Sequence, residues 1–284
     1  MTARIIDGRA LGSAMRGELR EEIAQYVQEH GSAPGLVVLR VEGDAASGVY
    51  SKAILRIAND VGIQARQEVL PTSTNPEELR ASLVRLNQDQ TVHGIIVQMP
   101  LPAHLPQQLV IETISAAKDI DGISVRSAGN LFLGLPGLQP STAVAVMESL
   151  KRSEIELAGK HAVIVGRSNV VGKPLAMLLL QKHATVTVCH SRSVELSALT
   201  RQADILIAAA GRARMITAEM VKPGATVIDV GTNALPEGGI VGDVEFATVS
   251  EVAGAITPVP GGIGPLTNVM LLKQCLQAAR EISA

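Results

Sequence analysis

The sequence predicts an α/β protein of two domains, each built on a parallel sheet that is covered by helices. The chain has 284 residues, which is enough for two separate cores. Strand-like and helix-like segments alternate along most of its length, as in proteins with parallel sheets. A stretch rich in Pro and Gly, residues 136–142, interrupts the alternation. We expect the junction between the domains there.

The first half of the chain predicts a β-α-β-α-β series. Short apolar runs bounded by polar or turn residues indicate strands, and apolar residues spaced three and four apart indicate helices. We expect helix 9–30, strand 35–41, helix 47–61, strand 64–70, helix 76–87, strand 93–100 and helix 106–115.

The second half repeats this alternation. We expect strands near 161–165, 184–189, 204–208, 225–230 and 253–256, with helices near 143–152, 173–182, 194–201, 217–220 and 265–282. No run approaches the roughly 18–20 apolar residues of a membrane span. The first residues also lack the apolar core of a signal peptide. We therefore expect a cytoplasmic protein with no membrane partner.

Composition excludes other classes of function. The net charge is −2, and the chain has two Phe, two Tyr and no Trp, so nucleic acid is not expected as a partner. Cys189 and Cys275 are far apart and fit buried apolar positions better than a metal pair. The six His residues show no metal-ligand spacing, so no metal is expected.

The most informative segment is residues 161–174, HAVIVGRSNVVGKP. An apolar run ends at Gly166, a polar loop with Arg167 and Ser168 follows, and an apolar helical run begins after Pro174. A strand that passes through a tight glycine turn into a helix directs backbone N–H groups at an anion, usually a nucleotide phosphate. An ordinary turn between a strand and a helix is the alternative interpretation.

The next predicted strand favours NADP as the cofactor. Folds that prefer NAD often carry an acid about 20 residues after the glycine turn, to bind a ribose hydroxyl. Here the run is His190-Ser191-Arg192-Ser193, without an acid. A hydroxyl and a guanidinium suit a 2′-phosphate, and Arg167 could add a second cation. Alternatively, Arg192 is a solvated loop charge.

Two later strands end in candidate cofactor contacts. One ends in Ala210-Gly211 and the next in Asp229-Val230-Gly231-Thr232. Because ligands of open α/β sheets bind at the carboxyl ends of strands, we expect Gly211 and Thr232 near the cofactor. The glycines could equally serve only to end their strands.

In the first half, helix 47–61 carries the side chain of most interest. Tyr50, Ile54, Ile57, Ala58 and Val61 lie on one stripe. Lys52 lies about 200° around the helix from Tyr50. The stripe is typical of a buried helix face, although tyrosine is rare in this chain.

Several strings together resemble the methylenetetrahydrofolate dehydrogenase/cyclohydrolase family. They are S-x-x-Y at 47–50, VQMPLP at 97–102, KDIDG at 118–122, GRSNVVGKP at 166–174, VGD at 241–243 and TPVPGGIGPLT at 257–267. The resemblance implies a homodimer whose subunits pair a folate-side domain with a Rossmann-type domain. It also implies that the last helix returns to the first domain, with domains at 1–139 plus 262–284 and at 140–261.

The resemblance further implies a reaction and its residues. Members oxidise 5,10-methylenetetrahydrofolate with NADP and hydrolyse the methenyl product to 10-formyltetrahydrofolate. Tyr50, Gln98 and Asp121 match catalytic positions, where Asp121 would bind the pterin. Substrate contacts match the same three residues and a further set: Pro100, Gly261, Gly262 and Pro265.

The sequence departs from the family at its catalytic lysine. The signature Tyr-x-x-x-Lys reads Tyr50-Ser-Lys-Ala-Ile54 here. Hydride removal leaves a cation that two nitrogens stabilise, so it needs no proton transfer. Hydrolysis needs one, and a positioned acid or base contributes roughly 10²–10⁴-fold. We therefore predict dehydrogenase activity with weak or absent cyclohydrolase activity. A full bifunctional enzyme with a compensating group, a non-catalytic folate- or NADP-binding paralogue, and an NADP oxidoreductase for another substrate are alternatives.

Other segments that line the cleft or the hinge in relatives also differ. After Gly122 the chain reads Ile123-Ser124-Val125, and the family's Pro-Cys-Thr-Pro becomes Pro140-Ser141-Thr142-Ala143.

Overall fold

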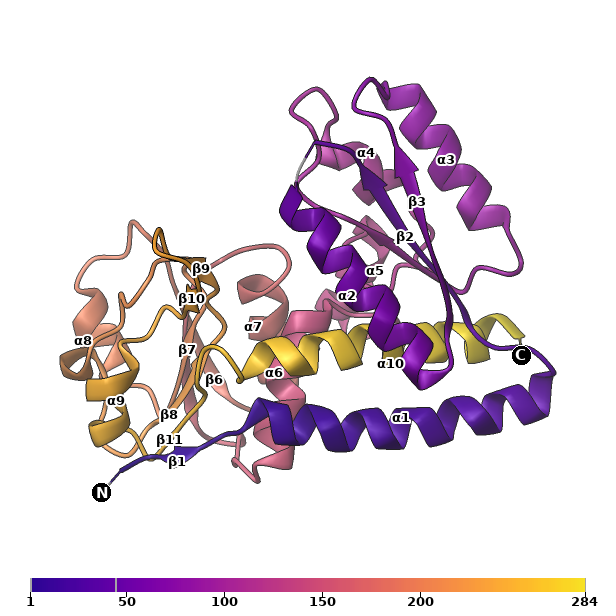
Figure 1. Cartoon of the computed structure of the whole chain (residues 1–284). Coiled ribbons are helices and arrows are strands. Elements are labelled where there is room, and N and C mark those ends of the chain that lie inside the picture. Colours follow the sequence, from indigo (N-terminus) through magenta and orange to yellow (C-terminus); the bar gives the residue numbers. More distant parts are fainter. Residues whose placement is uncertain (1, 44, 284) are drawn as a thin grey trace. The chain divides into compact units, whose positions relative to one another are not determined.

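The computed structural model describes residues 2–43 and 45–283, without the side chains of 45–47 and 49. The chain forms two compact units (Figure 1). The first comprises residues up to 13 and 142–267, and the second comprises 14–141 and those from 268 onward. The sequence-based boundaries placed 1–139 and 262–284 in one domain. Residues up to 13 group with the first unit because their strand joins its sheet.

The first unit contains a six-stranded parallel sheet. Its strand order is β1-β11-β8-β7-β5-β6. The bounds are β1 Arg4–Ile5, β5 His161–Val165, β6 Thr185–Cys189, β7 Ile205–Ala208, β8 Thr226–Asp229 and β11 Ala255–Ile256. Every pairing in this sheet is parallel. The order reverses direction at β5, which creates a switch point at the carboxyl ends of the strands.

Helices pack around this sheet. They are α6 Ser141–Arg152, α7 Gly172–Gln181, α8 Leu196–Thr200 and α9 Phe246–Val252, with a 3₁₀ turn at Ala218–Met220. A small antiparallel pair, β9 Asn233–Ala234 with β10 Ile240–Val241, lies apart from the main sheet. One face of the sheet forms an aliphatic core with members such as Val163, Leu206, Val227 and Ile256. As the composition predicts, aliphatic side chains fill this core.

The second unit is built on a three-stranded parallel sheet of order β3-β2-β4. The bounds are β2 Gly35–Val41, β3 Gln64–Leu70 and β4 Gly94–Val97. Its helices are α2 Ala45–Val61, α3 Pro76–Gln88, α4 Gln107–Thr113 and α5 Val125–Leu133. The long helices α1 Gly8–His30 and α10 Ile263–Ser283 contribute most of their length to this unit. Val37, Leu39 and Val41 pack against α3 and α4, so the other sheet face carries Leu36, Val38 and Arg40.

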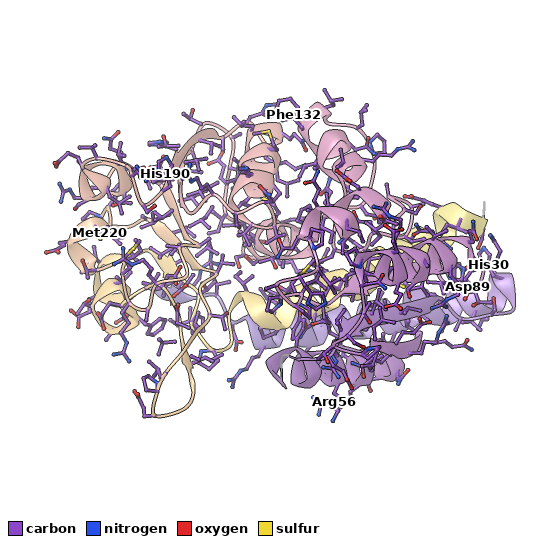
Figure 2. All side chains as sticks on the ribbon, turned by 90° about the horizontal axis from the view of Figure 1, so that it is seen from above. His30, Arg56, Asp89, Phe132, His190 and Met220 are labelled. Carbon is purple, nitrogen blue, oxygen red and sulfur yellow. The ribbon has the colours of Figure 1, made fainter. Side chains whose placement is uncertain are left out.

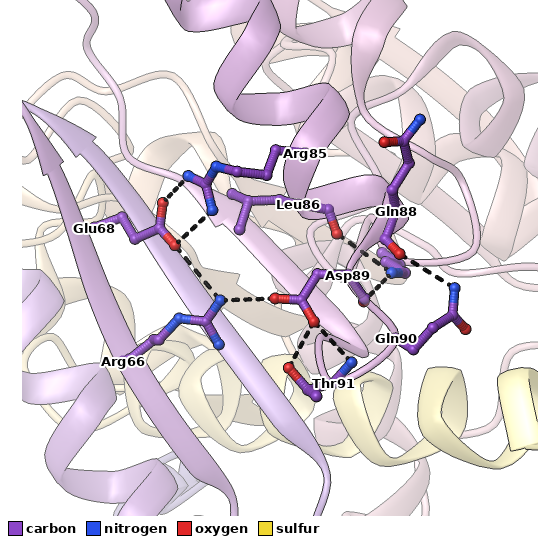
Figure 3. A network of polar contacts seen from close by, with 9 residues as sticks. Arg66, Glu68, Arg85, Leu86, Gln88, Asp89, Gln90 and Thr91 are labelled. Atoms are coloured by element: carbon purple, nitrogen blue, oxygen red, sulfur yellow. Dashed lines mark hydrogen bonds and ion pairs between the residues drawn. The ribbon is translucent and has the colours of Figure 1, made fainter.

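A polar network joins β3 to the end of α3 (Figure 3). Arg66 on β3 and Arg85 on α3 both bond Glu68, and Arg66 also reaches Asp89 at 3.1 Å. The Lys118 ammonium, from the KDIDG string, donates to the carbonyls of Leu86 and Asp89. Its position at the end of α3 satisfies carbonyls that the helix leaves unpaired. Lys118 therefore has a structural role.

The predicted fold class is confirmed, and most expected elements lie within two residues of their predicted ends. Sequence reasoning missed α5, α9 and the two-residue strands β1, β9 and β10. Helix α5 begins at the Ser124 side chain, which accepts from the Ser127 N–H. Phe132 (Figure 2) and Leu133, near the end of α5, are strongly exposed apolar residues. No helix in the described part of the chain is long and apolar enough to cross a membrane.

Candidate functional site

The glycine turn of the first unit is closely packed. Gly166 follows β5 with φ +142°, and a Cβ there would lie 2.1 Å from the Ala209 carbonyl oxygen. A Cβ at Gly172 would lie 2.1 Å from the Gly166 oxygen. Only glycine fits at these two positions, so the chain turns sharply from β5 into α7. The turn therefore presents the N-terminus of α7 at the switch point of the sheet.

The loop within this turn is ordered by its own side chains. The Ser168 hydroxyl accepts from the Val171 N–H at 3.1 Å, and the Asn169 side chain accepts from the Lys173 ammonium at 2.8 Å. No side chain caps the start of α7 within the described residues. Arg167 is exposed beside it. The Lys173 N–H donates to the Ser168 carbonyl oxygen at 3.1 Å, so the loop itself pairs part of the helix start. The N-terminus of α7 and the Arg167 cation together suit a phosphate.

The loop after β6 holds Ser191 and Arg192 at the surface. The His190 N–H donates to the Ser193 hydroxyl, and the Arg192 N–H donates to His190 Nδ1. These bonds give His190 a structural role in the loop. Both the Ser191 hydroxyl and the Arg192 guanidinium are exposed, as binding of a 2′-phosphate requires. Together with the glycine turn, they fit a phosphorylated dinucleotide.

Asp243 organises the neighbouring strand ends. This buried carboxylate accepts from the N–H groups of Ala210, Gly211 and Arg212 and from the Asn233 amide. Sequence reasoning used the VGD string only as part of the family resemblance and did not assign Asp243 a role. Four donors to one buried carboxylate fix the loops after β7 and β8, which carry Gly211 and Thr232.

A second buried carboxylate extends this network. Asp229 accepts from the N–H groups of Gly231, Asp243 and Val244. Burial raises the pKa of Asp229 to about 6 against the lowering effect of these bonds, and the charge of Asp243 adds to the rise. Thr232, the predicted cofactor contact, is exposed just beyond this network.

The glycines of the TPVPGGIGPLT string lie in the first unit and pack against the start of α1. A Cβ at Gly8 would lie 1.7 Å from the Gly262 oxygen, and Gly12 meets Pro265. Gly261 has φ +111° and lies beside Arg9. These contacts give Gly262 and Pro265 a packing role. Contacts of Gly261, Gly262 and Pro265 with substrate stay a prediction.

On the second unit, Tyr50 is 41% exposed on α2. Its hydroxyl donates to the Asn268 side chain on α10 at 3.2 Å. Desolvation of the hydroxyl raises the pKa of Tyr50 to about 12, and the nearby charge of Asp121 adds to the rise. Tyr50 therefore remains protonated over the physiological range and can act as a hydrogen-bond donor. It is not merely a packing residue of the α2 stripe.

Ser141, one of the residues that depart from the family pattern, holds the side chain of Asp121. The Ser141 hydroxyl donates to its carboxylate at 2.6 Å. Burial raises the pKa of Asp121 to about 6, the Ser141 bond lowers it, and the charge of Asp119 raises it. Gly122 has φ +62°, and a Cβ there would meet the backbone of Gln139 at 2.3 Å. The KDIDG string thus presents Asp121 from a closely packed turn.

Ile54 occupies the lysine position and is buried, with 1% of its surface exposed. It lies one helical turn after Tyr50 on α2. Ser51 and Ala58 are fully buried on the same face, whereas Lys52 is exposed on the other side. Lys52 therefore lies off the face that carries Ile54, as its position in the sequence predicts.

Gln98 and Pro100 follow β4 at the carboxyl edge of the sheet. The Gln98 N–H donates to the Leu39 oxygen at 2.9 Å, and the side chain is buried. The Met99-Pro100 peptide bond is cis. Beside this loop is a cavity of about 460 Å³ lined by Glu42, Gly43, Thr72, Pro100, Leu101, Pro102 and His104. The structure thus brings Tyr50 and Asp121 into electrostatic contact and places Gln98 at the end of a sheet strand.

Sequence reasoning missed two contacts on this side. Asn268, the partner of Tyr50, comes directly after the TPVPGGIGPLT string, and that position was the only signal for it. Ser141 was noted as a departure from the family, without a role. Among the described residues, no cluster of three or more His, Cys, Asp or Glu could hold a metal ion.

The fold and these sites define a two-unit α/β enzyme with a dinucleotide-binding unit and a second unit that carries a tyrosine, a buried glutamine and a carboxylate. Sequence profiles identify the family. Residues 6–121 match the catalytic domain of tetrahydrofolate dehydrogenase/cyclohydrolase, and residues 140–283 match its NAD(P)-binding domain. The chain belongs to the tetrahydrofolate dehydrogenase/cyclohydrolase family.

Individual relatives agree with this assignment. The bifunctional protein FolD of Geobacillus thermodenitrificans is 49% identical over 284 residues, which is 100% of both chains. The crystal structure of the bifunctional enzyme from Campylobacter jejuni has a TM-score of 0.96 at 43% identity, covering 98% of this chain and 99% of that one. The Trypanosoma brucei enzyme, solved with NADP and an inhibitor, has a TM-score of 0.94 at 37% identity, covering 99% and 98%.

These findings confirm several predictions. The family, the two-domain α/β fold with a Rossmann-type second half, the dehydrogenase class and NADP as the cofactor are as expected. The individual site residues and the boundaries of the domains stay predictions.

Proposed function

We propose that this enzyme oxidises 5,10-methylenetetrahydrofolate with NADP and hydrolyses the methenyl product slowly or not at all. The observation that carries the proposal is Ile54. A buried isoleucine stands where the family signature has lysine, and it can neither give nor accept a proton. The homodimer and the cytoplasmic location expected from the sequence belong to this proposal.

The residues of the second unit would hold the folate. The ionised Asp121 carboxylate would accept two parallel hydrogen bonds from the aminopyrimidinone edge of the pterin. Tyr50, protonated because its pKa is raised to about 12, would donate through its hydroxyl. The buried Gln98 amide would face the reacting end, as the resemblance implies. Orientation by these groups supports hydride loss because that step needs geometry and no proton transfer.

The first unit would hold NADP. The turn from Gly166 to Gly172 would take the pyrophosphate at the start of α7, and Ser191 with Arg192 would take the 2′-phosphate. Bound NADP would supply the acceptor for the hydride.

Hydrolysis, unlike oxidation, requires a residue that can transfer a proton. Water must add to the methenyl carbon and lose a proton, and the bond from that carbon to one ring nitrogen must break as the nitrogen gains a proton. Without an acid or base at position 54, the loss of a roughly 10²–10⁴-fold contribution is expected. The dehydrogenase step does not share this requirement.

A full bifunctional enzyme is the second candidate. It is favoured by the relatives, since those near 49% identity are named bifunctional. In that case a group other than residue 54 would transfer the proton.

One assay separates the two candidates. Purified enzyme is mixed with 5,10-methylenetetrahydrofolate and NADP, and NADPH, methenyl product and 10-formyl product are followed together. NADPH with methenyl product that decays no faster than in buffer supports the proposal. Rapid formation of 10-formyltetrahydrofolate would show that the second candidate is right. No NADPH at all would refute both.

A further inference from the structure

Arg40 brings a positive charge to the sheet face beneath α2. It lies near the end of β2, on the face opposite the cluster formed by Val37, Leu39 and Val41. Its guanidinium lies under the first turns of α2, because a Cβ at Gly48 would be 3.9 Å from Arg40 Cζ and Nη1. The absence of a side chain at Gly48 leaves room for the guanidinium.

The guanidinium has an unused donor. Arg40 Nε is buried and has no hydrogen-bond partner among the residues that the structure describes. A buried donor without an acceptor is rare in native proteins, since its desolvation is uncompensated. Such a group calls for an acceptor that the protein itself does not supply, such as a water molecule, an ion or a ligand.

Arg40 is a neighbour of Gln98. Leu39 pairs with Val97 in the parallel register of β2 and β4, so the next residues along, Arg40 and Gln98, lie beside one another. Ile95 and Val97 join the cluster on the opposite face, which leaves Gln98 on the face of Arg40. Adjacent parallel strands are about 4.8 Å apart. The unused donor therefore lies next to a residue assigned to the folate side.

The face of α2 that carries Gly48 also carries Ile54. Gly48, Ser51 and Ile54 are spaced three residues apart on α2, and Ser51 and Ile54 are buried. The family signature has a lysine on this helix, and Ile54 replaces it here. Arg40, on the sheet beneath the helix, supplies a different cation. A guanidinium carries only hydrogen-bond donors, so Arg40 can donate hydrogen bonds but cannot serve as the missing base.

We propose that Arg40 is a substrate-binding residue of the folate site, which donates a hydrogen bond to an oxygen on the pterin half of the folate. This inference rests on the proposed function for the identity of the ligand. The pterin half is favoured over the glutamate tail because Arg40 lies beside Gln98 and under the helix of Tyr50. Binding by a fixed charge affects affinity and leaves proton transfer unchanged.

The test is ligand binding without turnover. Isothermal titration measures the Kd of tetrahydrofolate, which carries no one-carbon unit, and of tetrahydropteroate, which lacks the glutamate tail. The proteins are the wild type, Arg40→Met, Arg40→Lys and the control Arg66→Met. Arg66 lies on the neighbouring strand and bonds Glu68 and Asp89 in a separate network (Figure 3).

Arg40→Met should weaken both ligands by about tenfold or more, because a charged hydrogen bond is lost. Arg40→Lys should recover part of the loss, and Arg66→Met should bind like the wild type. Without ligand, Arg40→Met should melt no lower than the wild type, since its donor has no partner there. In the NADPH assay its KM should rise while kcat stays within about twofold.

Three results would overturn the inference. Unchanged Kd values in Arg40→Met would show that Arg40 does not contact the folate. Weakening of tetrahydrofolate alone would place Arg40 at the glutamate tail. A lower melting temperature with no recovery in Arg40→Lys would show a structural role. A wild type that binds tetrahydrofolate through Arg40 but forms no NADPH would refute the proposed function and leave this inference standing.

Discussion

In the function proposed above, the side chain at position 54 separates two reactions that share one site. Ile54 is buried on the face of α2 one turn after Tyr50, and the exposed Lys52 lies on the other side. Oxidation depends on the placement of the substrate, which Tyr50 and Asp121 can provide. Hydrolysis depends on a proton carrier, which isoleucine is not.

Replacing Ile54→Lys should therefore raise hydrolysis of 5,10-methenyltetrahydrofolate by at least about 10²-fold. Burial lowers the pKa of a lysine, which suits an acid–base group near neutral pH. The same burial should lower the melting temperature. The measurement is the decay of the methenyl absorbance, with Ile54→Met as a control that changes shape without adding a titratable group. Equal rates in the two variants would contradict the explanation.

The pair Asp121 and Ser141 makes a prediction about pH. The pKa of Asp121 is raised to about 6, so its ionised form, which we propose binds the pterin, is gained as pH rises through that value. The Ser141 bond stabilises the ionised form. Ser141→Ala should raise the pKa of Asp121 and shift the acid limb of kcat/KM for oxidation to higher pH.

Profiles from pH 5 to 8 would test this, with Ser149→Ala as the control. Ser149 lies in the same helix and donates only to the Val146 carbonyl. An acid limb that stays in place in Ser141→Ala would exclude Asp121 as its source.

The sequence alone predicted only some of the candidate site residues. Tyr50, Gln98 and Asp121 were identified because each lies in a distinctive string. Asn268 and Ser141 act through contacts with residues 218 and 20 positions away. Contacts of this kind follow from the tertiary fold, and no local pattern reports them.

At the scale of elements, the β5–α7 turn depends on the absence of side chains. Gly172→Ala would place a Cβ 2.1 Å from the Gly166 oxygen and 3.0 Å from Arg167 Cα. The backbone would have to shift, which should cost about 1–3 kcal/mol of stability and weaken NADP binding. Urea unfolding and NADP titration would measure the two effects.

Gly17→Ala is the matched control. Gly17 lies within α1 with open space around its Cβ position. Alanine there should stabilise the protein by about 0.5–1 kcal/mol through its higher helix propensity. If both variants lost stability and NADP affinity alike, close packing at Gly172 would not be the reason.

The elements themselves were largely predictable. Strands such as β2 and β5 are mostly apolar runs, and helices such as α3 carry a capping box at Asn75 and Glu78. Strands β1, β9 and β10 were not predicted; each has two residues, and two residues show no period. β1 exists because it pairs with β11, at the other end of the chain.

At the scale of the whole molecule, the perturbed groups predict how stability depends on pH. Asp121 and Asp229 both have pKa values raised to about 6, so the folded state binds their protons more readily than the unfolded state. Stability from these two groups is gained as pH falls from about 6 toward 4. The pKa of His93 is lowered by burial, which opposes the gain below pH 6.5.

Protonation of two carboxyl groups should change the free energy of unfolding more than protonation of one imidazole. We therefore expect stability to rise from pH 7 to about pH 5. Below about pH 4 it should fall, because Glu68, Asp89 and Asp204 have lowered pKa values and lose their partners when protonated. Urea midpoints between pH 3 and 8 would show this maximum. A midpoint that falls steadily from pH 7 to 5 would mean that His93 dominates.

The first strand of the protein has a consequence for its synthesis. Arg4 and Ile5 pair with Ala255 and Ile256, so the first strand waits for a partner made about 250 residues later. At about 5–20 residues per second, that delay is on the order of 10–50 s. The second unit also cannot fold completely at an early stage of synthesis, since it includes the chain from residue 268 onward. The first unit can therefore complete its sheet only after residues 255–256 have been made, and the second unit only after residues from 268 onward have been made.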